Sequence, residues 1–322
     1  MKFMDVQAAG SVLKLAKIAR GADYFGVRIP EERAFALMDR YLELGGNVID
    51  TARIYGRAEP CEASYSNSEP IVGRWLKSRG TRGKVVLVTK GAHHVMEDPS
   101  QKRVTPECID RDLETSLREL GVDYVDIYFL HRDDPGKPVA EIMDALDRHV
   151  RAGRIRALGV SNWTCARIAE ANAYARENGK TPFTISQIQW GVAYVKPNAW
   201  GDPTLVSMNA KEYAGYLELG IPVMAFSPQA GGYFSKKISG EPLQPKFAER
   251  YDGPENRRRL EALREICART GASPAAVLLS YITSNKLPGC AVVGCSTLEQ
   301  LEDSMSACDL TLSEADIAAL EQ

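Results

Sequence analysis

Residues 151–161, with the sequence RAGRIRALGVS, contain the pattern that decides the fold. Arg151-Ala152-Gly153 is typical of a helix end, because a glycine past the last turn takes the left-handed conformation at little cost. Ile155–Ser161 follows directly as a short, mostly apolar run, which is typical of a parallel strand covered on both faces. This unit therefore predicts a helix that ends just before a buried strand.

The same unit recurs along the chain and gives eight predicted strands. They are Leu15–Phe25, Asn47–Thr51, Val85–Lys90, Val125–His131, Ile155–Ser161, Phe183–Trp190, Pro222–Ser227 and Gly289–Cys295. Eight strands that each lead into a helix predict an α/β protein with a closed (β/α)8 barrel, the TIM barrel, rather than an open sheet. No break in composition marks a second domain, so residues 1–322 are expected to form one barrel domain.

The segments that interrupt this alternation are enlarged loops after four of the strands, at residues 57–70, 92–104, 192–207 and 229–256. All four belong to the C-terminal face of the barrel, where barrel enzymes have their active sites. An extra helix is expected within Ser273–Asn285, before the eighth strand, because Ser273 and Pro274 suit the start of a helix. A short amphipathic helix is expected at Ser313–Leu320.

Charge and composition exclude several classes of function. The net charge is -2 and the pI about 6.2, which gives no basic face for nucleic acid. No stretch approaches the roughly 20 apolar residues that cross a membrane. The seven cysteines form no CxxC pair and are odd in number, so free thiols and a cytoplasmic location are expected.

Four polar side chains follow three consecutive predicted strands. Asp50 and Tyr55 come at the end of the second strand, Lys90 ends the third, and His131 ends the fourth. In a barrel these strand ends meet at one mouth. Together the four side chains suit the reduction of a carbonyl group, in which hydride addition leaves an alkoxide that needs a proton.

Tyr55 is the candidate proton donor. A free phenol has a pKa of about 10, and lowering it to near 7 takes roughly 4 kcal/mol. A lysine ammonium about 4 Å away supplies roughly that energy, so Lys90 is expected to lower the pKa of Tyr55. Asp50 would orient Lys90 and keep it charged, and His131 would orient the substrate oxygen.

Each of these residues alone has a structural explanation. On that interpretation, Asp50 would cap a loop and Tyr55 would pack over the barrel end. Lys90 would be a solvated strand end, and His131 would be a core histidine. Their combination at successive strand ends favours a shared site. His93 and His94 follow Lys90 closely and have two interpretations: they line the same mouth, or they form a solvated pair in the loop, which is favoured. No metal site is predicted because no third ligand has suitable spacing.

Three motifs carry a resemblance to a known family. DTARIYG at 50–56, VTKG at 88–91 and LHRDD at 130–134 resemble signature stretches of the aldo-keto reductase family, and the resemblance runs from about Ala16 to Ala307. It implies a catalytic tetrad of Asp50, Tyr55, Lys90 and His131, and reversible hydride transfer between a nicotinamide cofactor and a small-molecule carbonyl or alcohol.

The resemblance also implies how the cofactor is held, since no GxGxxG follows a strand. Ser161, Asn162 and Gln187 would contact the nicotinamide carboxamide, and Phe226 would stack on its ring. Residues of the last two strand ends would hold the rest of the cofactor: Ser227, Gly231, Gly294, Ser296, Thr297, Gln300 and Asp303. NADP(H) is favoured, and NAD(H) is the alternative because no basic residue stands between Gly294 and Asp303.

The substrate pocket is expected to include Tyr24, Ile54, Trp163 and Trp190, with Tyr233 as a further aromatic wall. Arg53 and Arg132 are expected to form structural ion pairs. Two other functions stay open at this point. One is a regulatory subunit that binds cofactor with little turnover, and the other is a dehydrogenase that works toward NAD(P) reduction.

Overall fold

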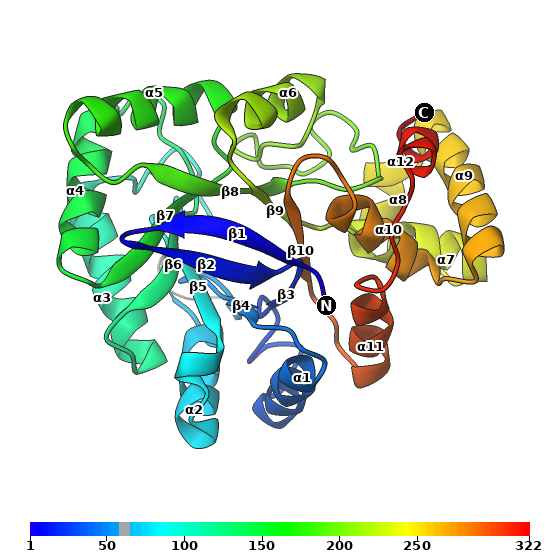
Figure 1. Cartoon of the computed structure of the whole chain (residues 1–322), viewed down its shortest axis with the longest axis horizontal. Coiled ribbons are helices and arrows are strands. Elements are labelled where there is room, and N and C mark those ends of the chain that lie inside the picture. Colours follow the sequence, from blue (N-terminus) through cyan, green and yellow to red (C-terminus); the bar gives the residue numbers. More distant parts are fainter. Residues whose placement is uncertain (58–64) are drawn as a thin grey trace.

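The computed structural model describes residues 1–57 and 65–322 and contains the expected closed barrel. Eight parallel strands close in the order β10-β3-β4-β5-β6-β7-β8-β9 (Figure 1). Their bounds are Ile18–Gly21 for β3, Val48–Asp50 for β4, Val86–Gly91 for β5, Val125–Leu130 for β6, Ile155–Ser161 for β7, Phe183–Gln189 for β8, Val223–Phe226 for β9 and Gly289–Val293 for β10. Each strand lies within one residue of a predicted run or inside it. The (β/α)8 prediction is therefore confirmed.

The first predicted run is the exception, because it contains parts of two strands. Leu15 belongs to β2 (Ser11–Ala16), which pairs antiparallel with β1 (Phe3–Ala8) in a hairpin that the sequence analysis did not predict. The hairpin lies across one end of the barrel (Figure 1). Met4, Val6, Leu13 and Leu15 are buried and pack on side chains of the barrel interior.

The hairpin covers the end at which the barrel strands begin. The backbone N–H of Ala9 donates to the carbonyl of Arg156, and the Thr184 hydroxyl donates to the carbonyl of Gln7. Arg156 and Thr184 each stand second in their strands, β7 and β8. The opposite end, where the strands finish, is therefore the end left to the long loops.

Helices surround the barrel on its outer side (Figure 1). Their bounds are Glu31–Glu43 for α1, Ser68–Arg79 for α2, Pro106–Leu120 for α3, Val139–Arg151 for α4, Cys165–Glu177 for α5, Ala210–Leu219 for α6, Tyr233–Ser239 for α7, Pro245–Tyr251 for α8, Pro254–Thr270 for α9, Pro274–Thr283 for α10, Leu298–Ser306 for α11 and Glu314–Glu321 for α12. The two extra helices expected near the C-terminus are α10 and α12. Within residues 1–57 and 65–322, no helix combines the length and apolarity that a bilayer crossing needs.

The loops at the strand ends are more structured than expected. The segment after β9 contains a 3-10 turn, Ala230–Gly232, followed by α7 and α8. A second 3-10 turn, Arg82–Lys84, precedes β5. The predicted loop at 57–70 lies partly outside the described residues, because it includes residues 58–64. Cys61 lies wholly outside them.

Candidate active site

The barrel interior determines which side chains reach the mouth. Val48, Val88 and Phe129 belong to the cluster that fills the interior. Because side chains two residues apart on a strand share a face, the next interior positions are Asp50, Lys90 and His131. The same spacing leads from Ile185 to Gln187 and from Met224 to Phe226. The interior rows of five strands thus end in residues that the sequence analysis selected.

Lys90 connects three neighbours at the mouth. Its Nζ donates to Asp50 Oδ2 at 2.8 Å, to the carbonyl of Thr51 at 2.9 Å and to the Tyr55 hydroxyl oxygen at 3.0 Å. Lys90 and Asp50 are almost completely buried. Since an ammonium has three N–H groups, every donor of Lys90 is used. The Tyr55 hydroxyl accepts from Lys90, so its own proton is free for another acceptor.

Tyr55 is held in a tight turn after β4. Its backbone N–H donates to the carbonyl of Ala52. Gly56 follows with φ +70°, and a Cβ at this glycine would lie 2.2 Å from the carbonyl oxygen of Phe25. Only glycine fits this close approach. The turn therefore fixes the direction in which the Tyr55 ring leaves the backbone.

The pKa of Tyr55 moves against the sequence-based expectation. Burial raises the pKa of Tyr55 well above its usual value, and the Asp50 and Asp23 carboxylates add to this effect, while Arg132 opposes it. Burial also lowers the pKa of Lys90, with Asp50 opposing. The expectation of a phenol near pKa 7 is therefore wrong for this arrangement. Tyr55 is a protonated phenol at neutral pH.

His131 lies beside Tyr55, with ring centroids 5.8 Å apart in an edge-on contact. Burial lowers the pKa of His131 well below its usual value, and neighbouring His93 and Arg132 lower it further. The imidazole is therefore neutral. Its Nδ1 is buried and has no hydrogen-bond partner among the described residues.

The candidate carboxamide contacts come from two paired strand ends, since Ser161 of β7 and Gln187 of β8 are register partners. Gln187 Nε2 donates to Asp50 Oδ1 at 3.0 Å, so this amide also fixes the carboxylate that holds Lys90. Asn162 has φ +61°, and its side chain accepts from the backbone N–H of Val206 at 3.1 Å. Asn162 therefore fastens the loop after β8 to the mouth.

The predicted residues for the rest of the cofactor lie at the ends of β9 and β10. Phe226 and Ser227 are partly exposed, and Gly231 and Gly294 are exposed. Thr297 caps α11 by accepting from the N–H of Gln300, whose side chain accepts from the N–H of Ser296 at 2.8 Å. Asp303 lies on α11 and is half-buried. These residues follow two neighbouring strands and form one rim of the mouth.

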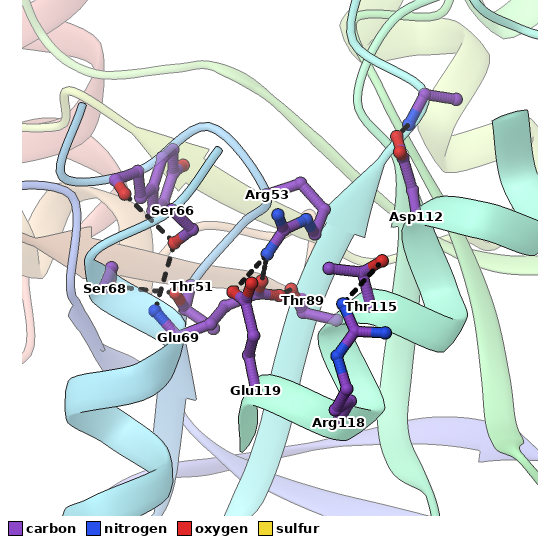
Figure 2. A network of polar contacts seen from close by, with 12 residues as sticks. Thr51, Arg53, Ser66, Ser68, Glu69, Thr89, Asp112, Thr115, Arg118 and Glu119 are labelled. Atoms are coloured by element: carbon purple, nitrogen blue, oxygen red, sulfur yellow. Dashed lines mark hydrogen bonds and ion pairs between the residues drawn. The ribbon is translucent and has the colours of Figure 1, made fainter. Parts of the chain in front are cut away.

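A network of polar contacts around Arg53 and Glu69 fastens the turn that carries Tyr55. Figure 2 shows this network from close by. The Arg53 guanidinium donates to both Glu69 and Glu119, and Arg53 and Glu69 are buried. Glu69 Oε1 also accepts from the Thr89 hydroxyl at 2.6 Å. Ser66 donates to the carbonyl of Tyr55 at 3.0 Å. The first turn of α2 is thereby fastened to both strands that carry the site.

Arg132 forms the other expected structural ion pair. Its partner is Asp202 rather than either adjacent aspartate, at 3.0 Å from Nη2, and its Nε donates to Thr204 at 2.9 Å. These contacts fasten residues 192–207 to the residue that follows His131. A cation is consequently held close to both Tyr55 and His131.

Only two of the four residues expected to line the substrate pocket are partly exposed at the mouth. Tyr24 and Ile54 are partly exposed near Tyr55. Trp163 and Trp190 are buried in the outer core, where Trp163 packs on Phe183 and Trp190 on Tyr213 and Tyr281. The expectation that Trp163 and Trp190 line the substrate pocket is therefore wrong. Trp190 follows Gln187 by three residues, so it faces the helices and not the barrel interior.

Tyr233 is a third aromatic residue that does not reach the mouth. It is almost completely buried, its ring packs on Phe234 and Tyr251, and its hydroxyl donates to Asp252 at 2.8 Å.

Asp23 was not predicted from the sequence, and the solvated state favoured for His93 and His94 is wrong. Asp23 is open to solvent, yet surrounding protein atoms raise the pKa of its carboxyl, with Lys90 opposing and Asp50 reinforcing. Interior Ala19 lies four residues before Asp23, so the spacing of two along β3 would have found it. His93 and His94 are buried and not solvated.

Comparison with known proteins agrees with this fold. A model of the aldo/keto reductase family matches residues 17–322, so the chain belongs to this family. The family is one of oxidoreductases that act on carbonyl compounds with nicotinamide cofactors.

Three curated relatives illustrate the match. The norsolorinic acid reductase stcV of Emericella nidulans is 29% identical, over 96% of this chain and 78% of its own length. The uncharacterized oxidoreductase YrpG of Bacillus subtilis is 29% identical, over 94% and 90%. The probable aryl-alcohol dehydrogenase AAD4 of Saccharomyces cerevisiae is 29% identical, over 90% and 87%.

Proposed function

We propose that this protein reduces aldehydes or ketones to alcohols by reversible hydride transfer from a nicotinamide cofactor, with Tyr55 as the proton donor. The observation that carries the proposal is the position of Lys90 Nζ, 2.8 Å from Asp50 Oδ2 and 3.0 Å from the Tyr55 hydroxyl. Lys90 occupies the acceptor side of the phenol and leaves its proton for a substrate oxygen. Neutral His131 stands beside that proton and can donate a second hydrogen bond.

A reduced nicotinamide bound at the mouth would supply the hydride for the carbonyl carbon. Tyr55 gives its proton to the carbonyl oxygen, so that an alcohol forms, and the phenol regains a proton from water. Lys90 stabilises the transient phenolate by the hydrogen bond that it already donates. His131 orients the carbonyl oxygen, and Asp50 with Gln187 keeps Lys90 in place.

The residues at the mouth fit a nicotinamide cofactor. A carboxamide needs both donors and acceptors, and adjacent strand ends bring a hydroxyl from Ser161 and amides from Asn162 and Gln187. The Asn162 amide already accepts from Val206 and donates to Ser161 Oγ at 3.0 Å, so it also orients that hydroxyl. Phe226 is a partly exposed ring at the end of β9, where it can stack on an aromatic heterocycle. Gly231 and Gly232 have φ of +62° and +82°, which suits close backbone approach to a phosphate.

We propose that the adenosine end binds at the start of α11 and that NADP(H) is preferred. Ser296 is the hydroxyl there that no helix cap uses, whereas Thr297 is already the cap. Ser296→Ala should weaken NADPH binding about tenfold, because it removes one hydrogen bond to the charged 2′-phosphate of the adenosine. NADH lacks this phosphate, so its binding should change less than about twofold. Thr297→Ser keeps the cap and is the control for helix integrity.

Fluorescence titration with NADPH and NADH measures both affinities for the Ser296 variants. Equal losses for the two cofactors would place the 2′-phosphate elsewhere.

The experiment that tests the function starts from the preferred cofactor in that titration. The oxidation of the reduced form of this cofactor is then measured in the presence of each member of a panel of aldehydes and ketones. The panel includes aryl aldehydes, since one relative is named an aryl-alcohol dehydrogenase. Turnover of several carbonyls is the expected result. Tight cofactor binding with no turnover, in either direction, would instead favour a regulatory subunit.

A further inference from the structure

Four rings form a continuous row at the mouth. Tyr55 contacts His131 with centroids 5.8 Å apart, His131 contacts His93 at 4.8 Å, and His93 contacts His94 at 4.2 Å. The three imidazoles are between 1% and 6% exposed. His93 and His94 belong to the loop after β5, directly beyond Lys90. The row therefore extends the site away from Tyr55 and past His131.

The hydrogen bonds of His93 and His94 define which nitrogens accept. His93 Nδ1 lies 2.8 Å from the carbonyl oxygen of His94, an acceptor, so Nδ1 carries the hydrogen and Nε2 carries the lone pair. His94 Nε2 faces Asp202 Oδ2 at 3.9 Å, which favours a hydrogen on Nε2 and leaves Nδ1 as the acceptor. Burial lowers the pKa of His93 to about 2, so the ring stays neutral.

His93 Nε2 and His94 Nδ1 are buried without a hydrogen-bond partner in the part of the chain that the structure describes. The nearby Arg132 guanidinium donates instead to Asp202, Thr204 and the carbonyl of His131. A buried acceptor without a donor costs about 1–3 kcal/mol. Beside a candidate active site, such an acceptor can be satisfied by a donor that arrives with the substrate.

The arrangement does not suit a metal. Among residues 1–57 and 65–322, no group of three histidine, cysteine or acidic side chains could hold an ion. The rings also meet by edge-on and tilted contacts, and Nδ1 of His93 is already bonded to a carbonyl. Neutral ring nitrogens that accept suit a neutral donor such as a hydroxyl group.

We propose that the substrate is a hydroxy-carbonyl compound, with a hydroxyl on the carbon next to the carbonyl, and that His93 Nε2 accepts the hydrogen bond from this hydroxyl. The proposal rests on the proposed function, which puts the carbonyl oxygen between Tyr55 and His131. His93 packs against His131 with ring centroids 4.8 Å apart, and its Nε2 has no partner among the described residues, so it suits a substituent next to the carbonyl group. His93 is then a specificity-determining residue.

Hydroxyacetone and 2-butanone provide the test, because they differ only by a hydroxyl in place of a methyl group. The kcat/KM of each ketone is measured for the wild type, His93→Phe and His93→Gln. Phenylalanine keeps a ring against His131 but has no acceptor, whereas the glutamine oxygen restores one. The hydroxyl also activates the carbonyl chemically, so the readout is the change of preference on substitution and not the preference itself.

The expected result is that His93→Phe lowers kcat/KM for hydroxyacetone at least about tenfold and that for 2-butanone less than about threefold. His93→Gln should recover part of the preference. His149→Gln, at the remaining histidine, which bonds Asp110 on the outer face of the barrel, should leave both ketones unchanged.

Two failures are distinguishable. Equal losses for both ketones in His93→Phe, or an unchanged preference, would overturn the role of His93 while the reductase function stands; water would then satisfy its Nε2. Lack of turnover of both ketones and of the whole carbonyl panel by the cofactor-bound wild type would overturn the proposed function itself.

Discussion

At the scale of single residues, Lys90 accounts for most of the chemistry proposed for the site. It donates to Asp50, Thr51 and Tyr55 at once, which leaves it no freedom to bond a substrate. Its proposed role is to hold the phenol and to stabilise the charge that appears when the phenol loses its proton. The proposed reaction therefore depends on a phenol that is protonated before the hydride moves.

The first prediction concerns the pH dependence of reduction. Burial and two carboxylates raise the pKa of Tyr55, and a proton donor works only below its own pKa. We expect kcat/KM for carbonyl reduction to stay level from about pH 6 to about pH 9 and to fall only as pH rises through a value above about 10. Initial rates at saturating cofactor measure the profile. A midpoint near pH 7 would contradict the raised pKa.

The residues of the candidate site were predictable where residue type and strand position agreed. Asp50, Tyr55, Lys90 and His131 stand at strand ends with side chains that suit one reaction. The fate of Trp163 and Trp190 was not predictable from residue type, because a large aromatic suits a pocket wall and an outer core equally. Only the position along β8 separates the two cases for Trp190.

At the scale of elements, the turn that carries Tyr55 is fastened to α2. The link is the buried pair of Arg53 and Glu69, reinforced by Thr89 of β5 and by Glu119 of α3 (Figure 2). The resemblance motif DTARIYG contains Arg53, yet its partners lie 16 and 66 residues away. The network was therefore invisible in the local sequence.

Glu69→Gln tests how much the buried pair of Arg53 and Glu69 contributes to stability and to the position of Tyr55. The substitution leaves Arg53 less well neutralised in a buried position, so we expect the free energy of unfolding to fall by about 2–4 kcal/mol. The loosened Tyr55 turn should lower kcat more than it raises KM. Urea unfolding and steady-state kinetics measure the two effects.

Glu119→Gln is the matched control for Glu69→Gln. Its side chain is 26% exposed, so its loss should cost about 1 kcal/mol or less. Similar losses of stability and of kcat in both variants would show that the buried partner has no special role in holding the turn.

The N-terminal hairpin shows why one element escaped prediction. Met4 and Val6, and then Leu13 and Leu15, are buried at alternate positions, which is the period of a strand with one covered face. The alternation is short, and only one polar residue, Lys17, separates the end of β2 from the start of β3. The hairpin was consequently merged with the first barrel strand.

At the scale of the whole molecule, the regular alternation of helix ends and apolar runs was enough to predict the barrel. Each glycine-terminated helix end stands just before a strand, as at Gly121, Gly153, Gly179 and Gly220. These glycines have φ between +60° and +72°. The helices in the loop after β9 were not predictable, since α7 and α8 have seven residues each and pack on each other and on the 3-10 turn Ala230–Gly232.

Burial of neutral histidines at the mouth gives a whole-molecule prediction. The pKa values of His93, His94 and His131 are all lowered, to about 2 for His93, whereas an unfolded histidine has a pKa of about 6.5. Below about pH 6.5 the unfolded chain binds protons that the folded chain refuses, so stability falls as pH falls toward the folded pKa. At higher pH this contribution is constant.

Urea unfolding between about pH 7 and about pH 5 measures this effect. His93→Phe removes one such group and should reduce the loss of stability by about 1 kcal/mol per pH unit in this range. An identical pH slope in the wild type and in His93→Phe would contradict the assignment of His93 as a buried neutral ring.

The most direct test of the central claim is a comparison of the wild type with Tyr55→Phe. The substitution removes the hydroxyl that Lys90 contacts at 3.0 Å and keeps the ring. We predict that kcat for carbonyl reduction falls about a thousandfold, while the cofactor dissociation constant from fluorescence titration changes less than about threefold. Undiminished reduction by Tyr55→Phe, or a loss of activity explained entirely by lost cofactor binding, would contradict the account.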